Sequence, residues 1–336
     1  MFKVKEINSN SLLQGLTNVG KAFRRLASYE DTLDNLLIDA NTKVICQGIS
    51  GKHGTIQTKI ALEYGTKVVA GISKNPKVKT HLDLPVFQSV RQAKIITKPD
   101  ASIIFVPAPL AKNALIEAIQ EEIKLVVCIT KGIPYHDMIK VHHILKKQSK
   151  TRLLGPHSSG IIVPNICKIG VIPHNICQEG DIGVISRSGT YSYDVIAQIT
   201  KKNLGQSLCI NIGGDALIGT NYVDCLKLFL KHPKTKGIVI IGEIGGDYEE
   251  EAAKYLREKN VGDNKKVVVA TIVGATALPN RKYGHASAII TSNYGSAKSK
   301  IDKLETSGVV IAKNPSQVGD TIFNEMKRNG LIGRTS

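Results

Sequence analysis

From about residue 40 onward, short apolar runs alternate with amphipathic stretches long enough to form helices, and this alternation restricts the possible folds more than any other feature. The apolar runs are rich in valine and isoleucine, which predicts buried strands, whereas the stretches between them repeat with helical periodicity. Parallel strands need a crossover connection, which is usually a helix. The pattern therefore predicts an α/β protein built from βαβ units around parallel sheets.

The alternation occurs in two series, separated by a less regular stretch at residues 161–180 that we interpret as the inter-domain connection. The first series predicts strands at residues 43–47, 67–72, 102–106, 124–130 and 152–154, and helices at 55–64, 112–121 and 135–147. The second series predicts strands at 183–186, 207–212, 237–241, 266–272 and 308–312, and helices at 190–201, 221–231, 248–258, 295–307 and 315–329. Two α/β domains are therefore expected, at residues 38–165 and 166–336.

Composition narrows the classes of function. The 336 residues carry a formal net charge of +17, but the lysines are spread along the chain and only 5% of the residues are aromatic. Nucleic-acid binding usually needs clustered cations and aromatic stacking, so no nucleic-acid partner is expected. A basic balance instead suits small acidic ligands such as phosphates and carboxylates. No apolar run approaches the roughly 18 residues of a membrane-spanning helix, so no membrane insertion is expected.

The six cysteines indicate buried thiols rather than a metal site or a disulfide framework. They form no CxxC pair and show no zinc-site spacing. Four of them lie in or beside predicted strands, which is typical of buried thiols in a reducing compartment.

The first 28 residues have the features of a targeting segment. On a helical wheel one face of this segment is apolar and consists of Leu12, Leu16, Val19, Phe23 and Leu26. The opposite face is basic and carries Lys21, Arg24 and Arg25. The segment holds five basic residues and one acidic residue, which is typical of mitochondrial transit peptides. We interpret residues 1–28 as a transit peptide and expect the mitochondrial matrix, or a mitochondrion-derived organelle. The alternative is an ordinary surface helix.

A glycine-rich turn follows the first predicted strand and opens a helix. Gly48, Gly51 and Gly54 allow a tight turn and the close approach of a ligand, and the helix start offers free N–H groups to a pyrophosphate. The lysines that could pair with phosphates are Lys52, Lys74, Lys77 and Lys112. The spacing differs from the dinucleotide-binding motif GxGxxG. About 20 residues later there is also no evident Asp or Glu to bind the ribose hydroxyls of a dinucleotide. A nicotinamide-dependent oxidoreductase is therefore disfavoured.

A second helix start, in the second series, is rich in hydroxyl groups. Ser186, Ser188 and Thr190 surround a glycine directly after a predicted strand. An ordinary helix cap needs only one such hydroxyl. Three of them, together with free N–H groups and the helix dipole, favour a phosphate site.

One histidine, His285, lies between Gly284 and Ala286, where little side-chain bulk would hinder the approach of a phosphate. Glu243 follows a predicted strand on a glycine turn, and a carboxylate that accepts from one imidazole nitrogen leaves the other nucleophilic. Taken alone, His285 would more readily be a structural or surface residue. With Glu243 and the hydroxyl-rich helix start, it predicts a covalent phosphohistidine.

These segments together resemble the α subunits of succinyl-CoA synthetase, also called succinate–CoA ligase. The resemblance covers about residues 40–330, in order and with matching spacing. The matching segments are residues 48–55, 80–87, 106–109, 132–134, 167–170, 186–190, 213–215, 242–246, 249–253 and 284–286.

The resemblance implies a Rossmann-like CoA-binding domain followed by a flavodoxin-like doubly wound domain with a transiently phosphorylated histidine. By its motif this histidine is His285, and Glu243 would be its hydrogen-bonding partner. The phosphate-binding helix start would comprise Ser186, Ser188, Gly189 and Thr190, with Tyr193 as a substrate-side contact. The expected CoA contacts are Ser50, Gly51, Lys52, His53, Lys74, Lys77, Ile129, Thr130 and Lys131.

The resemblance also implies the reaction and the partner. Succinyl-CoA, phosphate and a nucleoside diphosphate would be interconverted with succinate, CoA and the triphosphate, as in the citric acid cycle. The partner would be a β subunit of ATP-grasp fold that binds ATP or GTP with Mg²⁺ and supplies a second helix N-terminus. No metal ligand is expected on this chain.

The first domain departs from the family pattern at several positions. The family's Pro-Gly-Lys-Gly-Gly loop is replaced by residues 74–78, a glutamate by Lys131, and Asn-Cys-Pro by His157-Ser158-Ser159. These changes leave two alternatives open. One is a related NDP-forming acyl-CoA synthetase for another acid, and the other is a CoA-binding pseudo-subunit that has lost turnover.

Overall fold

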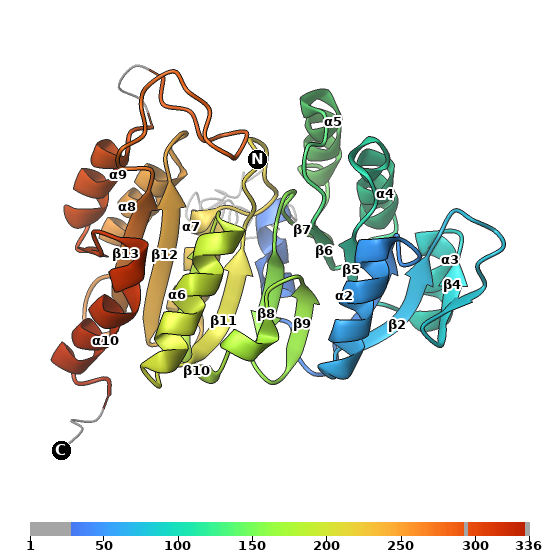
Figure 1. The fold of residues 1–336 in the computed structure, drawn as a ribbon, viewed down its shortest axis with the longest axis horizontal. Coiled ribbons are helices and arrows are strands. Elements are labelled where there is room, and N and C mark those ends of the chain that lie inside the picture. The colour runs from blue at the N-terminus through green and yellow to red at the C-terminus, as the bar shows by residue number, and fades with distance from the viewer. Residues whose placement is uncertain (1–27, 292–294, 333–336) are drawn as a thin grey trace, which may run out of the picture.

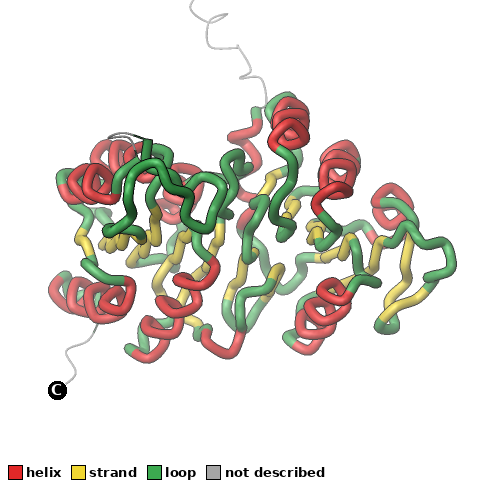
Figure 2. The backbone as a smooth tube through the Cα atoms, turned by 45° about the horizontal axis from the view of Figure 1, so that its top comes forward, coloured by secondary structure: helices red, strands yellow, loops and turns green. Residues whose placement is uncertain are grey.

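A computed structural model describes residues 28–291 and 295–332. Two seven-stranded sheets lie side by side, and helices cover both faces of each (Figure 1, Figure 2). The strand order is β3-β4-β2-β1-β5-β6-β7 in the first sheet and β14-β13-β12-β10-β11-β8-β9 in the second. The predicted α/β class with two successive units is confirmed, whereas the predicted transit peptide lies, apart from Ser28, outside the described residues.

The first sheet is parallel except at one edge, where β3 (Thr80–His81) runs antiparallel to β4 (Leu84–Phe87). Its other strands are β1 (Lys43–Gln47), β2 (Lys67–Ile72), β5 (Ala101–Ile104), β6 (Leu125–Cys128) and β7 (Arg152–Leu154). Its helices are α2 (Lys52–Glu63), α3 (Val90–Thr97), α4 (Ala108–Gln120) and α5 (Tyr135–Leu145). Helix α2 lies on one face of the sheet and α4 and α5 lie on the other. The central strands are therefore buried on both sides, which explains why their sequences are continuous apolar runs.

The second sheet is parallel across β10 (Glu179–Ser186), β11 (Gln206–Asn211), β12 (Gly237–Glu243), β13 (Val267–Val273) and β14 (Val310–Ile311). Helices α6 (Gly189–Lys201) and α10 (Val318–Arg328) pack together on one face. Helices α7 (Tyr222–Lys231), α8 (Tyr248–Lys259) and α9 (Ala297–Glu305) cover the other. The carboxyl ends of these parallel strands meet at one edge, where ligands bind in such folds.

The stretch interpreted as an irregular inter-domain connection contains two strands of the second sheet. Strand β8 (Gly160–Val163) pairs antiparallel with both β11 and β9 (Cys167–Gly170). The chain thus enters the second sheet at Gly160, before the boundary expected after residue 165. These strands are short, and Gly160 pairs with Gly170. Only a glycine fits at residue 160, because a Cβ there would lie 2.1 Å from the Ile169 carbonyl oxygen. Glycine-containing strands of four residues give little periodic signal.

Some elements begin where the sequence indicated loops. Helix α4 begins at Ala108 rather than at residue 112: Pro107 is its N-cap and Pro109 lies in its first turn, where a missing N–H costs nothing. Helix α2 begins at Lys52, inside the glycine turn. The short helix α3, the strands β3 and β4 and the 3₁₀ segment η1 (Tyr29–Leu36) have no counterpart among the predicted elements.

The cysteines are free thiols, as expected, and five of the six are buried. Burial raises the pKa of Cys46 and of Cys128 to about 12, because the low-polarity interior disfavours the thiolate. No helix in the described part of the chain is long and apolar enough to cross a bilayer.

Candidate active site at the junction of the two sheets

His285 belongs to the loop that follows β13, and this loop passes over the carboxyl edge of the second sheet (Figure 1). The loop folds back on itself as a short hairpin: Tyr283 N donates to Ala288 O at 3.0 Å, and Ala288 N donates to His285 O at 3.2 Å. Gly284, with φ of +68°, supplies the left-handed turn before the histidine. The imidazole remains 19% exposed.

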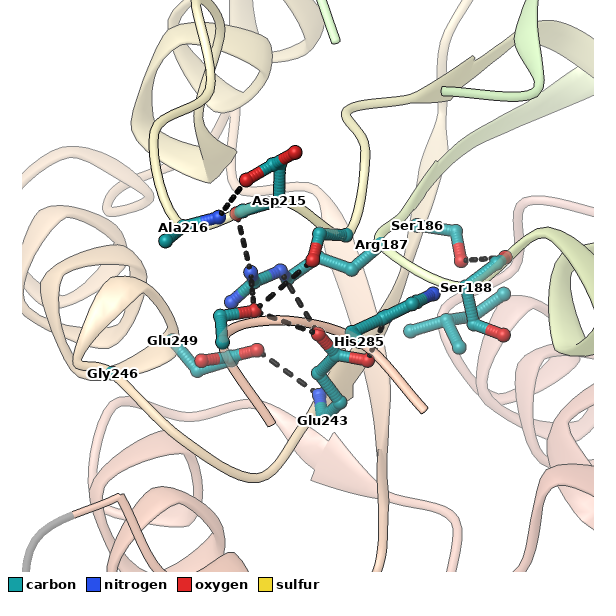
Figure 3. A network of polar contacts seen from close by, with 12 residues as sticks. Ser186, Arg187, Ser188, Asp215, Ala216, Glu243, Gly246, Glu249 and His285 are labelled. Carbon is teal, nitrogen blue, oxygen red and sulfur yellow. Dashed lines mark hydrogen bonds and ion pairs between the residues drawn. The ribbon is translucent and has the colours of Figure 1, made fainter. Parts of the chain in front are cut away.

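Glu243 ends β12 directly beneath this imidazole. His285 Nδ1 lies 2.6 Å from Glu243 Oε2, and the carboxylate is only 9% exposed. An ionised carboxylate can only accept, so Nδ1 is the donor, and in the neutral ring this leaves the lone pair on Nε2. Figure 3 shows the ring extending away from Glu243 toward Ser188, so the lone pair faces the start of α6.

Arg187 holds the other oxygen of this carboxylate. Its guanidinium is fully buried, with Nε 3.3 Å from Glu243 Oε1. It also donates to the Asp215 carbonyl oxygen at 3.2 Å and to the Ser287 hydroxyl, two residues after the histidine (Figure 3). Burial is the largest single influence and disfavours its charge, but Glu243 and Glu249, together with Tyr222 and Tyr248, outweigh burial, so the pKa of Arg187 is raised.

A second buried ion pair supports the turn that carries Glu243. Glu249 Oε1 accepts a hydrogen bond from Glu243 N at 3.0 Å, and its other oxygen pairs with Lys300 from α9. Lys300 Nζ also reaches Glu250 and the Gly246 carbonyl, both at 3.0 Å. The side chains of Lys300 and Glu249 are fully buried. This cluster fixes the backbone of the glycine turn and thereby the position of Glu243.

The hydroxyl-rich helix start has divided roles. Ser186 is buried, and its hydroxyl donates to Ser188 O at 2.7 Å, so it shapes the turn. Ser188 is the N-cap of α6 and accepts from Tyr191 N at 3.4 Å. Ser188, Gly189 and Thr190 border the open space beside His285, and the positive end of the helix dipole points there.

A cavity of about 570 Å³ opens where these residues meet the first sheet. Its walls come from both sheets, and the lining residues are His53, Phe105, Val106, Pro107, Ala108, Ile129, Thr130, Lys131, His157, Ser158, Ser159, Val171, Ser188, Gly189, Thr190, Tyr193 and His285. The structure thus brings the expected contacts His53, Ile129, Thr130 and Lys131 together with the phosphate-binding candidates and the histidine. No group of His, Cys, Asp and Glu side chains suited to a metal ion occurs among residues 28–291 and 295–332.

The remaining first-domain candidates lie outside this cavity. Ser50 and Gly51 are exposed at the start of α2, with Ser50 Oγ 3.2 Å from Ser73 Oγ. Lys52 is exposed on the first turn of the same helix, and Lys77 is exposed in the loop after β2. Lys74, in the same loop, is exposed and contacts Glu117 and Gln88.

Lys74 Nζ lies 3.3 Å from a carboxylate oxygen of Glu117 on α4 and donates to the Gln88 carbonyl at 3.0 Å. Its side chain is nevertheless 75% exposed. An exposed pair of this kind is worth only about 0–1 kcal/mol, so a phosphate could displace Glu117.

Two family models match the chain. One, described as a CoA binding domain, matches residues 39–132, and the other, described as CoA-ligase, matches residues 185–310. The protein named succinate–CoA ligase [ADP-forming] subunit alpha from Staphylococcus epidermidis is 42% identical over 297 residues, which cover 88% of this chain and 97% of that protein. The protein of the same name from Aquifex aeolicus is 44% identical over 293 residues, covering 87% and 95%.

The chain belongs to the family of succinate–CoA ligase α subunits. It carries the CoA-binding and CoA-ligase domains of that family in the expected order. The cavity described above therefore lies between these two domains.

Solved structures share this fold at lower identity. ATP citrate lyase from Methanosaeta concilii, in complex with (3S)-citryl-CoA, matches 90% of this chain with a TM-score of 0.76 and 22% identity. Dinucleotide-forming acetyl-coenzyme A synthetase 1 from Ca. Korarchaeum cryptofilum, in complex with phosphate and ADP, matches 86% with a TM-score of 0.69 and 20% identity. This chain spans 53% and 61% of those longer chains, so the likeness concerns the fold of a part of each.

Sequence reasoning passed over Arg187 and the pair of Glu249 and Lys300. Arg187 stands between two serines that were singled out, but nothing in the sequence shows that its guanidinium turns inward. Lys300 lies 51 positions from Glu249, on a helix whose other buried residues are Ala297 and Leu304. A lysine among the buried positions of α9 is the signal that could have indicated a buried partner.

Gly214 has a steric role beside His285. A Cβ on this residue would lie 2.4 Å from Cγ of the His285 ring. The side chain of the neighbouring Asp215 stabilises its own turn, since Oδ1 accepts from Ala216 N at 2.7 Å. Its backbone carbonyl, rather than its carboxylate, contacts Arg187.

Proposed function

We propose that this chain is the α subunit of an NDP-forming succinate–CoA ligase and that His285 carries the phosphoryl group. One observation supports this most strongly. The Nδ1 atom of His285 is bound to Glu243 at 2.6 Å, while the opposite side of the ring faces the start of α6 and the inter-domain cavity. A purely structural histidine would have no need of an open nitrogen facing a helix N-terminus.

The residues fit a ping-pong transfer of a phosphoryl group. Phosphate attacks the thioester of succinyl-CoA, the C–S bond breaks, and succinyl phosphate forms. His285 Nε2 then attacks the phosphorus, and the P–O bond to the succinyl carboxylate breaks, which releases succinate. The phosphoryl group finally passes from Nε2 to a nucleoside diphosphate. Such transfers depend chiefly on positioning and on charge stabilisation.

Each charged group has a distinct part in these steps. Glu243 stabilises the positive charge that develops on the ring as Nε2 becomes phosphorylated. Arg187, whose pKa is raised, forms an ion pair with Glu243 and so offsets the cost of burying that side chain. The N–H groups at Ser188, Gly189 and Thr190 offer donors to the phosphoryl oxygens.

The nucleotide-binding half of the reaction is proposed to belong to a β subunit of ATP-grasp fold. It would bind ATP or GTP with Mg²⁺, which neutralises phosphate charge, and would contribute a second helix N-terminus. The family membership and the exposed side of His285 support this partnership. Co-purification of the tagged chain with a β subunit tests it.

We further propose that the chain acts in the mitochondrial matrix, or in a mitochondrion-derived organelle, after removal of residues 1–28. The support is the composition of that segment, with five basic residues against one acidic residue. Import into isolated mitochondria with cleavage near Ser28 is the expected outcome. Failure of a fusion of residues 1–28 to be imported would contradict the proposal.

The activity itself is tested with the αβ complex. We expect succinyl-CoA formation from succinate, CoA and a nucleoside triphosphate, and its loss in His285→Asn. Activity that survives this substitution would rule out the phosphohistidine route.

The contacts of Lys74 support a second candidate, in which CoA binding or acid selectivity differs from that of the relatives. Lys74 is paired with Glu117, and Lys131 brings a cation to the cavity where the family pattern has a glutamate. Calorimetry with CoA, followed by activity assays with a series of carboxylic acids, distinguishes the candidates. Measurable CoA binding with preference for another acid favours a related acyl-CoA synthetase, and no CoA binding favours a pseudo-subunit.

A further inference from the structure

His157 lies where the chain crosses from the first sheet to the second, between β7 and β8. Its backbone is held from both sides: His157 N donates to Thr130 O at 3.0 Å, and Gly214 N donates to His157 O at 3.3 Å. It adopts a φ of +56°, which is uncommon for a residue with a side chain. This conformation and its two anchors hold the imidazole at the wall of the inter-domain cavity.

The ring of His157 packs edge to face against the ring of His285. Their centroids are 5.0 Å apart, and their planes are inclined by 79°. Both rings line the cavity. Among the residues that the structure describes, no hydrogen-bond partner is found for either ring nitrogen of His157. A half-buried imidazole without a partner, placed beside the proposed phosphoryl carrier, is free to exchange a proton with a ligand.

The charges around His157 favour its neutral form. Burial is the largest influence that lowers its pKa, and His285 on the loop after β13 and Lys131 after β6 act in the same direction. Asp215 after β11 and Glu243 at the end of β12 oppose them, but the net pKa is below the ordinary value of about 6.5. Near pH 7 the ring therefore holds a lone pair and can act as a base.

A base at this place would serve the thioester-forming step. In succinyl phosphate the carbonyl carbon is one oxygen away from the phosphorus that His285 attacks, so a thiol that attacks this carbon must come close to the His285 ring. The thiol is brought by the first domain, whose wall of the cavity includes Thr130 and Lys131. His157, anchored to Thr130 and in contact with His285, borders the space between them.

We propose that His157 accepts the proton of the CoA thiol as the acyl phosphate is converted to the thioester, an inference that rests on the function proposed above. The S–H proton moves to a ring nitrogen of His157, and the thiolate sulfur attacks the carbonyl carbon. The C–O bond to phosphate breaks, and the departing phosphate takes the proton from the imidazolium of His157. Thioester and hydrogen phosphate result, and His157 returns to its neutral form. In the opposite direction the same residue protonates the leaving thiolate.

Other side chains on the cavity wall are less suited to this step. Lys131 is a cation and cannot accept a proton in that state. The hydroxyl of Ser158 already donates to the Asn211 carbonyl. His53 lies exposed on the first turn of α2 and has no contact with His285 among the described residues.

The test separates three partial reactions of the αβ complex in His157→Asn. Asparagine tolerates a positive φ, so the backbone conformation can be kept. We expect unchanged phosphorylation of His285 by the nucleoside triphosphate, and unchanged trapping of succinyl phosphate by hydroxylamine in the absence of CoA. Single-turnover formation of succinyl-CoA should fall by roughly 10²- to 10⁴-fold, the usual contribution of a positioned base.

The pH profile of the thioester-forming step gives an independent readout. In the unsubstituted complex the rate should rise with pH as His157 loses its proton and level off near neutrality. In His157→Asn, and in a second variant His157→Gln, the rate should instead keep rising toward the pKa of a free thiol, about 8.5. His232→Asn, a histidine at the end of α7 outside the cavity, serves as the matched control and should leave all three reactions unchanged.

Three results would overturn the role of His157. These are a thioester-forming rate within a few fold of the unsubstituted complex in both variants, an equal slowing of all three reactions, or a pH profile that the substitutions do not change. A complex that made succinyl-CoA without phosphorylating His285 would instead contradict the proposed function, and the role of His157 would still be judged from its own rate and pH profile.

Discussion

Three side chains form a line of contacts that ends at the open nitrogen of His285. Arg187 is bound to one oxygen of Glu243, and the other oxygen is bound to Nδ1 of the histidine. Because Arg187 and Glu243 are buried, each would be costly without the other. The same arrangement that satisfies two buried charges therefore fixes the tautomer needed for a nucleophilic imidazole.

Glu243→Gln should slow phosphorylation of His285 and leave CoA affinity nearly unchanged. The amide cannot offset the positive charge of the phosphorylated ring, and charge-assisted hydrogen bonds of this kind are worth about 1.5–3 kcal/mol. That range corresponds to roughly a 10- to 150-fold loss of rate. Single-turnover phosphorylation and CoA calorimetry on the same preparation measure the two effects. Equal losses in both would show that Glu243 has a structural role only.

Arg187→Met should lower the free energy of unfolding by about 3–5 kcal/mol, because it leaves the Glu243 carboxylate buried without its partner. Urea unfolding measures this change. Arg257→Met is a suitable control, since Arg257 is exposed on α8 and its loss should stay within about 0.5 kcal/mol. A loss for Arg187→Met no larger than that of the control would mean that the buried ion pair does not support this site.

The residues closest to the chemistry could be proposed from the sequence, and those that hold them could not. His285 and Glu243 stand in short glycine-containing motifs whose family resemblance is specific. Arg187 and Lys300 act through contacts with residues 56 and 51 positions away, respectively. Which charges turn inward depends on the packing of the folded chain, and local patterns do not show it.

At the level of elements, the loop after β11 leaves room for the imidazole only because it contains Gly214. We expect Gly214→Ala to displace the His285 ring, since the added Cβ would lie 2.4 Å from its Cγ. Phosphorylation should then fall by more than tenfold, while CoA binding in the first domain persists. Gly262→Ala is the control, because it strains a left-handed glycine with open space around it and far from the site. Normal phosphorylation of Gly214→Ala would contradict the packing described here.

Strand β9 carries a buried lysine into the junction of the two sheets. Lys168 Nζ donates to Gly170 O at 2.7 Å and to Gln57 Oε1 at 3.4 Å, and burial lowers its pKa to about 8. Between pH 8 and about 10.5 the unfolded chain keeps this proton while the folded chain has lost it. The contribution of Lys168 to the free energy of unfolding therefore rises with pH in that window.

The measurement is urea unfolding of the protein and of Lys168→Met at pH 8 and pH 10. The difference in unfolding free energy, protein minus variant, should increase with pH by up to about 1.4 kcal/mol per unit. Taking the difference removes the titration of the buried cysteines, which the two chains share. A difference that stays constant or decreases would show that the Lys168 pKa is not lowered by folding.

The strands with long aliphatic runs were predictable because burial on both faces leaves a continuous apolar signature, as in β12. Strands β8 and β9 were missed because they are short and pair antiparallel at Gly160 and Gly170, where the chain changes sheets. Helix α4 starts earlier than expected because Pro107 and Pro109 fit a helix N-terminus as well as a loop.

In the whole molecule, the cavity exists only because the two sheets meet. Its first-domain wall holds the CoA-side candidates, such as Thr130, and its second-domain wall holds the start of α6 and His285. Neither domain alone could bring a thioester to the imidazole. The order of the domains was predictable from the sequence. Their contact surface, including the His157–His285 ring pair, depends on three-dimensional packing.

The central claim is that His285 becomes phosphorylated, and mass spectrometry tests it directly. The purified chain is incubated with its β subunit and ATP or GTP, and the modified residue is located by fragmentation under conditions that preserve phosphohistidine. We predict one acid-labile phosphoryl group on His285, absent in His285→Ala and removed by adding succinate and CoA. No phosphoryl group with a competent β subunit, or one on a different residue, would contradict this account.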